Sequence, residues 1–313
     1  MSALRSFFFT LALTANAAMA ASAAQAADVI RHVSTTGKNS NACTLTAPCR
    51  TLQRAINLAP TGGEVRILDS GFYGNNATIR KSLTITGNGF TVMLDSPIVV
   101  NDAGAVVTLR GLMLDGQGAV TTGIRVDAAA AVHVERCVVQ GFSGVGIAAT
   151  AQGVGLFVVN TISRDNGGSG VSTNAVRLTV DNSRFENNGQ SGITVLSSEA
   201  TIRRSLASGN GTSGIIALLS FAEIASTSAV HNGSAGFSAQ SSTMTIDSSA
   251  ASGNDAGPRL DSAAIARISN STFTRNATGI SNGGGGLVET RANNTVRGNT
   301  TEVTGTLTPI GAL

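Results

Sequence analysis

The chain of 313 residues contains 37 glycines and no tryptophan, and only 4% of its residues are aromatic and 12% charged. A globular domain of this length rarely has so few large core side chains, so the composition favours one elongated domain around a narrow core. The net charge is +3 and no basic run is longer than Arg203-Arg204, which argues against nucleic-acid binding.

Residues 1–27 are typical of a secretory signal peptide. Arg5 provides a short positive region, residues 7–13 form an apolar run, and small residues follow before a cleavage expected at Ala27 or Asp28. The apolar run is too short to cross a bilayer, which takes about 20 residues. We therefore expect an exported protein, periplasmic or extracellular, with no membrane span after the signal is removed.

Residues 28–63 are predicted to form an N-terminal cap. Cys43 and Cys49 enclose a short loop, and in an oxidising compartment a disulfide between them is favoured over free thiols. No metal site is expected there, because the only nearby histidine is His32. A helix with one apolar face is predicted from residue 51 to residue 58, where a proline and glycines end it.

From residue 64 onward, three kinds of side chain recur at a spacing of 22 residues. The asparagines of this series are Asn166, Asn188, Asn210, Asn232, Asn254 and Asn276. The aliphatic residues are Val158, Val180, Ile202, Ile224, Ile246 and Ile268. The hydroxylated residues are Thr161, Ser183, Ser205, Thr227, Ser249 and Ser271. A repeat this regular indicates a solenoid whose coils stack one above another.

The repeat predicts an all-β fold, a single-stranded right-handed parallel β-helix over residues 64–313 with the short N-terminal helix as its cap. Leucine does not recur as a leucine-rich repeat requires, and so much glycine, serine and asparagine would destabilise helical repeats. Three short strands per coil fit the length, and successive coils would lie about 4.8 Å apart. Stacked inward asparagines would then bond one another, and glycines would serve where the chain needs a positive φ.

Two further residues take their expected places from the repeat. Cys137 occupies the hydroxyl position one coil before Thr161, so we expect a buried interior thiol and not a catalytic one. Pro309 lies in the last apolar segment, which suits a terminal strand that no further coil must pair with.

The residues of the cap and the coils resemble those of pectin-lyase-like right-handed β-helix proteins. The similar segments are Ala47 to Ile56, Gly62 to Ile67 and Gly71 to Tyr73 in the cap, and Asn187 to Gly189 and Ser191 to Val195 in the coils. The resemblance implies the fold over nearly all of the mature chain. It does not select an activity, because the superfamily includes lyases, polygalacturonases, epimerases, phage tailspikes and non-catalytic surface proteins.

The family's enzymes carry acids, bases and often calcium ligands on one outward sheet, and aligning the coils tests for such a set. One outward column reads Asp181, Arg203, Ala225, Asp247 and Ser269, and the preceding one Thr179, Thr201, Glu223, Thr245 and Arg267. Neither column has carboxylates in successive coils, so neither a two-acid hydrolase nor a calcium cage is indicated. Aromatic platforms for sugars are also not expected, since Tyr73 lies in the cap.

The nearest approach to a catalytic group is predicted in the early coils, where Asp102 and Asp127 lie near one bend and Arg125 is close to them. Arg110 and Glu135 are predicted to neighbour each other, with Asp115 nearby. A lyase or epimerase needs a base and a positive charge, which this group could supply. The alternative is that these are solvated charges and turn-forming aspartates.

Two functions follow. The favoured one is a non-catalytic exported β-helix that binds polysaccharide or another surface through its polar face. The other is a polysaccharide lyase, hydrolase or epimerase acting on acidic glycans from Asp102, Arg125 and Asp127. A surface adhesin is a third possibility. No cofactor, metal or nucleic-acid partner is predicted.

Overall fold

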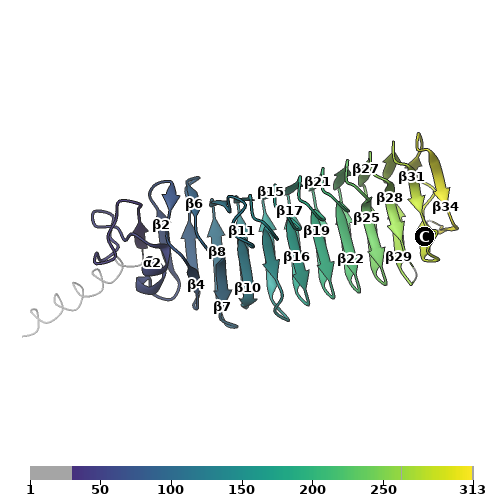
Figure 1. The fold of residues 1–313 in the computed structure, drawn as a ribbon. Helices are drawn as coiled ribbons and strands as arrows, with labels where there is room; N and C mark the ends of the chain where they lie inside the picture. The colour runs from purple at the N-terminus through teal and green to yellow at the C-terminus, as the bar shows by residue number, and fades with distance from the viewer. Residues whose placement is uncertain (1–29, 262, 312–313) are drawn as a thin grey trace, which may run out of the picture.

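The computed structural model describes residues 30–261 and 263–311, and over these the chain winds as a solenoid of parallel strands. Three sheets, here A, B and C, run along the solenoid, and each coil contributes one strand to each sheet (Figure 1). The predicted right-handed β-helix is confirmed. The predicted signal peptide, residues 1–27, lies outside the described residues. No helix within these ranges has the length and apolarity needed to cross a membrane.

Sheet A has 13 strands in the described ranges. In spatial order they are β1 (Ile30–Val33), β2 (Gly63–Ile67), β5 (Leu83–Thr86), β8 (Val106–Arg110), β11 (Ala131–Glu135), β14 (Gly155–Val159), β17 (Arg177–Asp181), β20 (Glu199–Arg203), β23 (Phe221–Ala225), β26 (Thr243–Asp247), β29 (Ile265–Ser269), β32 (Leu287–Thr290) and β35 (Leu307–Pro309). As predicted for a proline-containing segment, β35 is the terminal strand of its sheet.

Sheets B and C each have 11 strands in the same ranges. Sheet B consists of β3 (Gly71–Phe72), β6 (Thr91–Met93), β9 (Met113–Asp115), β12 (Val138–Gln140), β15 (Ile162–Arg164), β18 (Arg184–Glu186), β21 (Leu206–Ser208), β24 (Ser228–Val230), β27 (Ala250–Ser252), β30 (Thr272–Thr274) and β33 (Thr295–Val296). Sheet C consists of β4 (Ala77–Ile79), β7 (Ile98–Asn101), β10 (Ile124–Ala128), β13 (Ile147–Ala149), β16 (Val171–Asn174), β19 (Ile193–Leu196), β22 (Ile215–Leu218), β25 (Ala235–Gln240), β28 (Ala256–Leu260), β31 (Thr278–Ser281) and β34 (Thr301–Thr304).

The core is a narrow column enclosed by the three sheets. The aliphatic ladder from Val158 to Ile268 is fully inside it, with each residue at most 1% exposed. Phe185, Phe237 and Phe273 are buried in the same column and fill its width. Alternation along most strands therefore places every second side chain inside and the others outward, whereas β25 and β28 are buried along nearly their whole length.

The asparagine ladder stacks as the repeat predicts. Asn188 Nδ2 donates to Asn210 Oδ1 at 3.0 Å, and the backbone N–H of Asn188 donates to the same oxygen at 3.1 Å. The other Nδ2 hydrogen of Asn188 bonds the Ser163 carbonyl at 3.1 Å. Each buried amide is thereby satisfied without water. The ladder continues one coil further than predicted, to Asn299, because the spacing there widens to 23 residues.

The C-terminal end of this ladder is closed by a carboxylate. Asn299 Nδ2, which has no further asparagine to bond, donates to Glu302 Oε2 at 2.8 Å. The N–H of Gly298 donates to Glu302 Oε1 at 3.1 Å. Glu302 thus supplies the acceptor that the next coil would otherwise provide.

The hydroxyl ladder also forms, and a second one accompanies it. The N–H of Ser183 donates to Ser205 Oγ at 3.2 Å, as the 22-residue repeat predicts. A serine column that we did not predict lies at the corner between sheets C and A, where the N–H of Ser198 donates to Ser220 Oγ at 3.1 Å and that of Ser220 to Ser242 Oγ at 3.0 Å. Both columns bond the backbone of the coil before them.

From residue 136 to residue 285, each coil turns at three single residues with positive φ, and most of them are not glycine. In one coil these are Asn160, Asp165 and Ala175, with φ of 51°, 54° and 59°. Glycine supplies the positive φ, as predicted, only at some corners, such as Gly209 and Gly253. The glycines that precede an apolar residue at the 22-residue spacing, such as Gly192, do not have a positive φ. They are required by space, since a Cβ on Gly192 would lie 2.7 Å from the Gly214 carbonyl oxygen and 3.0 Å from Asn210 Nδ2.

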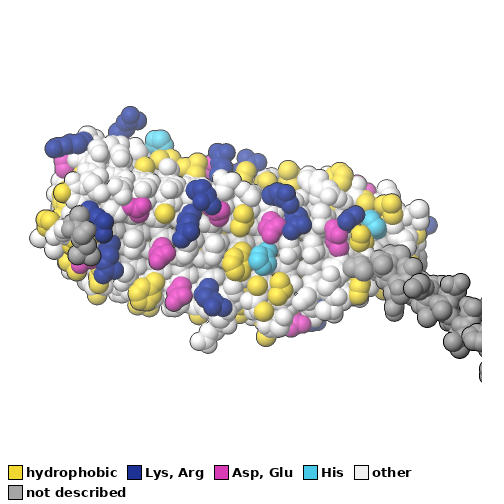
Figure 2. Space-filling model, turned by 180° about the vertical axis from the view of Figure 1, so that it is seen from behind, with side chains coloured by type: hydrophobic (Ala, Val, Ile, Leu, Met, Phe, Trp, Pro, Cys, Tyr) yellow, Lys and Arg dark blue, Asp and Glu magenta, His cyan; other side chains and the backbone are white. Residues whose placement is uncertain are grey.

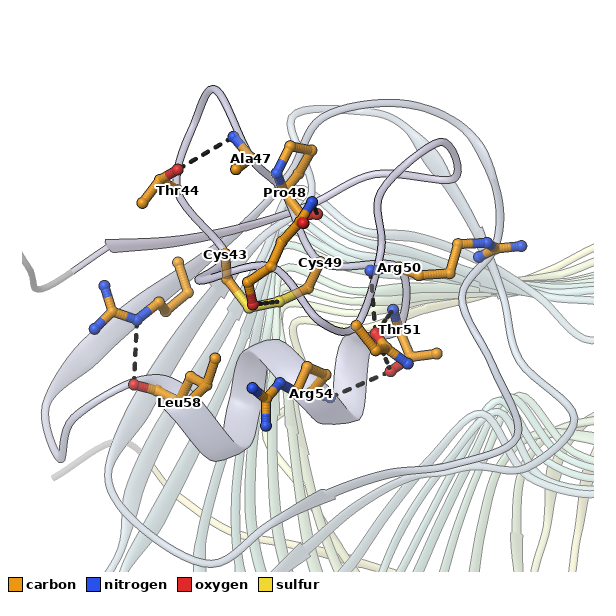
Figure 3. The surroundings of a disulfide bond; sticks show 12 residues. Cys43, Thr44, Ala47, Pro48, Cys49, Arg50, Thr51, Arg54 and Leu58 are labelled. Carbon is orange, nitrogen blue, oxygen red and sulfur yellow. Dashed lines mark hydrogen bonds between the residues drawn. A yellow bond between two sulfur atoms is a disulfide. The ribbon is translucent and has the colours of Figure 1, made fainter.

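The cap covers the N-terminal end of the column. Helix α2 (Leu52–Leu58) begins after Thr51, whose hydroxyl accepts from the N–H of Arg54, and packs against β1 and β4. Burying Leu52 and Ile56 stabilises this end by about 1.5–3 kcal/mol each. Figure 3 shows the disulfide between Cys43 and Cys49 beside the helix.

A polar network joins the cap to the first coil. The Asp69 carboxylate accepts from Ser34 Oγ at 2.6 Å, from the Thr35 N–H at 2.9 Å and from the hydroxyl of buried Tyr73. Burial raises the pKa of Asp69, but these hydrogen bonds to the ionised form outweigh it, so the pKa lies below its ordinary value.

Candidate functional site

The three predicted site residues lie near one another on sheet C. Arg125 and Asp127 face outward on β10, and Asp102 follows β7 in the preceding coil, where its N–H donates to the Ala128 carbonyl at 2.9 Å. Arg125 Nε donates to both oxygens of Asp127, at 3.0 and 3.1 Å. Asp102 Oδ1 accepts from the N–H of Gly104 at 3.0 Å. Each carboxylate therefore has a structural contact, which supports the interpretation as turn and surface residues.

The other charged residues predicted near this group do not join it. Arg110 and Glu135 are neighbours, as predicted, and form an ion pair of 2.9 Å between β8 and β11 on sheet A. Asp115 lies on sheet B, where its carboxylate accepts from the Gln117 N–H and from Gln140. The predicted group is thus divided among sheets A, B and C. Each strand is short, so residues only a few positions apart in the sequence can lie on different sheets.

Sheet A carries a groove that the sequence did not indicate. A hollow of about 390 Å³ crosses β17, β20 and β23, and we call it the β17–β23 groove. Its outward lining residues are Arg177, Thr179, Glu199, Thr201, Phe221 and Glu223. Thr179 and Thr201 pair in register and form a floor of small side chains, while Phe221 is 65% exposed at one side. The groove therefore combines an exposed ring with hydroxyl, carboxylate and guanidinium groups.

The two glutamates of the groove come from successive coils. Glu199 pairs with Phe221, and Glu223 with Thr201, so the two glutamates lie on a diagonal and not in one column. One coil and two residues of offset separate their Cα atoms by about 8 Å. Comparing the coils column by column places Glu199 opposite Arg177 in one column and Glu223 in another, so the diagonal pair of glutamates was missed.

The groove continues around the corner between sheets C and A. A second hollow of about 410 Å³ shares Arg177, Glu199 and Phe221 and adds Leu219. Leu219 is 65% exposed and has a φ of 52°. The left-handed conformation costs an L-residue about 1–2 kcal/mol, and this side chain gains no burial in return. Leu219 and Phe221 thus make an exposed apolar wall beside the carboxylates.

A second aromatic ring lies on the same face. Phe157 of β14 stacks on His133 of β11, with ring centroids 4.6 Å apart and planes 7° from parallel. We did not predict these outward rings from the sequence. Comparing coils could have found these rings, because Phe157 replaces the threonine of the next two coils and Phe221 replaces the glutamate of the previous one.

The hollow at the corner between sheets A and B is larger, about 680 Å³, and is lined by asparagine, serine and arginine side chains. Its two arginines are already paired, Arg184 with Glu186 at 2.6 Å and Arg204 with Asp181 at 2.5 Å. Figure 2 shows positive and negative side chains interspersed over the face seen there, with no single patch of one sign. Because both of its arginines are paired with carboxylates, the hollow between sheets A and B presents polar groups with little net charge.

Two other kinds of site find no support in the described ranges. No group of three histidine, cysteine, aspartate or glutamate side chains there could hold a metal ion. Cys137 is a free thiol in the column, 1% exposed, and burial raises its pKa to about 11. A thiol that remains protonated and enclosed is not a nucleophile.

Comparison with solved structures shows the same fold in polysaccharide-modifying enzymes. The A-module of mannuronan C-5 epimerase AlgE4 from Azotobacter vinelandii matches with a TM-score of 0.53 and 17% identity, over 83% of this chain and 95% of that one. The pectate lyase Pel9A matches with a TM-score of 0.53 and 15% identity, over 78% of this chain and 75% of that one. At these identities the likeness is one of fold.

Comparison by sequence gives the family. No curated protein matches the chain significantly. The model of the right-handed β-helix region matches residues 122–301, which is more than half of the chain. The coils in this range are those that carry the asparagine ladder and the β17–β23 groove. The chain therefore belongs to the right-handed β-helix family, with the pectin-lyase-like fold.

Proposed function

We propose that this protein is exported and binds glycan, without catalysis, through the outward face of sheet A at the β17–β23 groove. The observation that carries the proposal is the exposed Phe221 ring beside threonine, glutamate and arginine side chains in one hollow. Sugars present one apolar face of C–H groups and a rim of hydroxyls, which such a mixture of groups complements. The proposal is supported by the fold, because two structures with the same fold are named as a mannuronan epimerase and a pectate lyase.

The export part of the proposal rests on residues 1–27 and on the Cys43–Cys49 disulfide, which suits an oxidising compartment. Expression of the full chain with cell fractionation and N-terminal sequencing tests it. A mature chain that begins at Ala27 or Asp28 outside the cytoplasm is the expected result. An uncleaved chain in the cytoplasm would contradict it.

The binding part is tested with a panel of soluble neutral, acidic and amino polysaccharides, scored by calorimetry. We expect binding to at least one, weakened roughly fivefold by Phe221→Ala, since stacking on an aromatic ring contributes about 1 kcal/mol. Leu287→Ala is the matched control, because Leu287 is a partly exposed apolar residue in the same outward column of sheet A. Circular dichroism of both variants checks that the solenoid is intact.

The non-catalytic part is supported by the structural contacts of Asp102 and Asp127. The same polysaccharide panel, assayed for unsaturated products, reducing ends and changed uronate composition, tests it. Product from any polymer, lost in Asp127→Asn with the fold retained, would favour the lyase or epimerase function instead. Binding to none of the polymers would refute glycan recognition itself.

A further inference from the structure

The carboxylates of the β17–β23 groove differ from the others on sheet A in having no partner. Five outward carboxylates of sheet A are held by hydrogen bonds or ion pairs: Glu64, Glu135, Asp181, Asp247 and Glu289. In the described part of the chain, no hydrogen bond or ion pair engages the side-chain carboxylate of Glu199 or of Glu223, and both residues are exposed. These two are therefore free to bind a group from outside the chain.

The charge and shape of the groove restrict what that group can be. Its lining contains Glu199 and Glu223 against Arg177, two negative charges and one positive, so the net charge is −1. This disfavours a polyuronate and favours a ligand with a positive charge. The apolar wall of Leu219 and Phe221, which the chain itself leaves uncovered, requires an apolar surface on the same ligand.

The position of the groove argues for a sugar and against a peptide strand. It lies in the middle of sheet A, where the backbone of β20 is paired on both sides by β17 and β23. A peptide that adds a strand needs a free sheet edge, which this position does not offer. Three adjacent strands span about 10 Å, room for about two sugar units.

We propose that the groove binds glycans whose amino sugars carry free, protonated amines, with the C–H face of a pyranose ring on Phe221 and the ammonium group between Glu199 and Glu223. The inference rests on the proposed glycan-binding function and names its ligand class. Acetylation of the amine removes the charge and adds bulk, so the N-acetylated form of the same sugar should bind poorly.

Calorimetry with a glucosamine tetramer and an N-acetylglucosamine tetramer tests this, at low salt and at a mildly acidic pH where the amines of the sugar are charged. We expect the free-amine tetramer to bind at least about tenfold more tightly, as charge-assisted hydrogen bonds predict. Glu199→Gln or Glu223→Gln should reduce this preference to about twofold or less while leaving the weak binding of the acetylated tetramer unchanged. Phe221→Ala should weaken both tetramers.

Glu289→Gln is the matched control, because Glu289 faces outward on the same sheet but is paired with Arg267 at 2.7 Å. It should leave both affinities unchanged. Equal binding of the two tetramers, tighter binding of a uronate tetramer, or an unchanged preference in both groove variants would overturn the inference and leave glycan binding standing. Displacement of the glucosamine tetramer by an equal concentration of tetralysine would assign the groove to basic peptides. Absence of binding to every glycan would instead refute the proposed function.

Discussion

Substituting one rung of the asparagine ladder, Asn210→Ala, should destabilise the solenoid strongly. The Asn210 side chain accepts from the N–H and Nδ2 of Asn188 and donates to Asn232 Oδ1 and to the Phe185 carbonyl, all within 2.9–3.1 Å. It is 1% exposed, so water cannot replace these bonds. Removing the side chain leaves the backbone N–H of Asn188 without its acceptor. The side-chain amide of Asn188 also loses one of its two hydrogen bonds and keeps the one to the Ser163 carbonyl.

The size of the effect follows from these groups. A buried donor left without a partner costs about 1–3 kcal/mol, and the amide with one lost bond adds to it, so we expect about 3–5 kcal/mol in total. That is a large part of the roughly 5–15 kcal/mol by which a typical domain is stable. Urea unfolding, followed by far-ultraviolet circular dichroism, measures it as a fall in the midpoint.

Asn174→Ala is the control, because Asn174 is exposed at the end of β16 and the same atoms are removed. Its effect should stay within about 0.5 kcal/mol. Equal losses in the two variants would refute the reasoning, since the ladder would then add nothing beyond what any asparagine contributes.

Three other predictions follow from packing and charge. Gly192→Ala should destabilise the fold by about 1–3 kcal/mol, because the added Cβ would lie 2.7 Å from a carbonyl oxygen. Gly283→Ala is the control and should be neutral, because open space surrounds that position. Thermal melting measures both, and equal melting temperatures for the two variants would contradict the steric explanation. Cys137, whose pKa is raised to about 11, should resist iodoacetamide at neutral pH in the folded protein and react with it in urea. Mass spectrometry measures the labelling, and a labelled thiol in the folded protein would mean that Cys137 lies outside the core. The lowered pKa of Asp69 means that the native state binds fewer protons there than the unfolded state, so its contribution is present above pH ~4 and lost as the pH falls through the folded pKa. Asp69→Asn should flatten the dependence of stability on pH below that value, and an unchanged slope would assign the acid sensitivity elsewhere.

The architecture could be predicted from the sequence because stacking repeats the same chemistry every coil. Asparagine at Asn166 and its successors has few uses at a 22-residue spacing other than an internal ladder. The short helix is likewise readable, since Thr51 caps it and its apolar residues share one face. Register then followed, and the outward columns of sheet A, such as Thr179 beside Thr201, are confirmed.

The groove could not be predicted, for two physical reasons. Its glutamates meet along a diagonal, which a search by columns does not examine, and Phe221 is an apolar residue that a pattern places inside by default. The positions of the corners were not predicted, because one residue in the left-handed conformation is enough to turn the chain and no single residue type marks it. Residues as different as Arg204, Leu219 and Ser226 occupy corners. The serine column through Ser220 was hidden by the abundance of serine around it.

The hydrogen bonds between successive side-chain amides of the asparagine ladder all run in one sense, from the Nδ2 of each asparagine to the Oδ1 of the asparagine in the next coil, from Asn166 to Asn299. Their dipoles therefore add along the long axis, as peptide dipoles do along an α-helix, and the hydrogen-bearing end of the row is electropositive. The Glu302 carboxylate lies at that electropositive end, as acidic side chains do at the N-termini of α-helices. The asparagine row thus gives the solenoid a net dipole along its axis. A coil added beyond Asn299 would need an acceptor oxygen of its own to replace the Glu302 carboxylate.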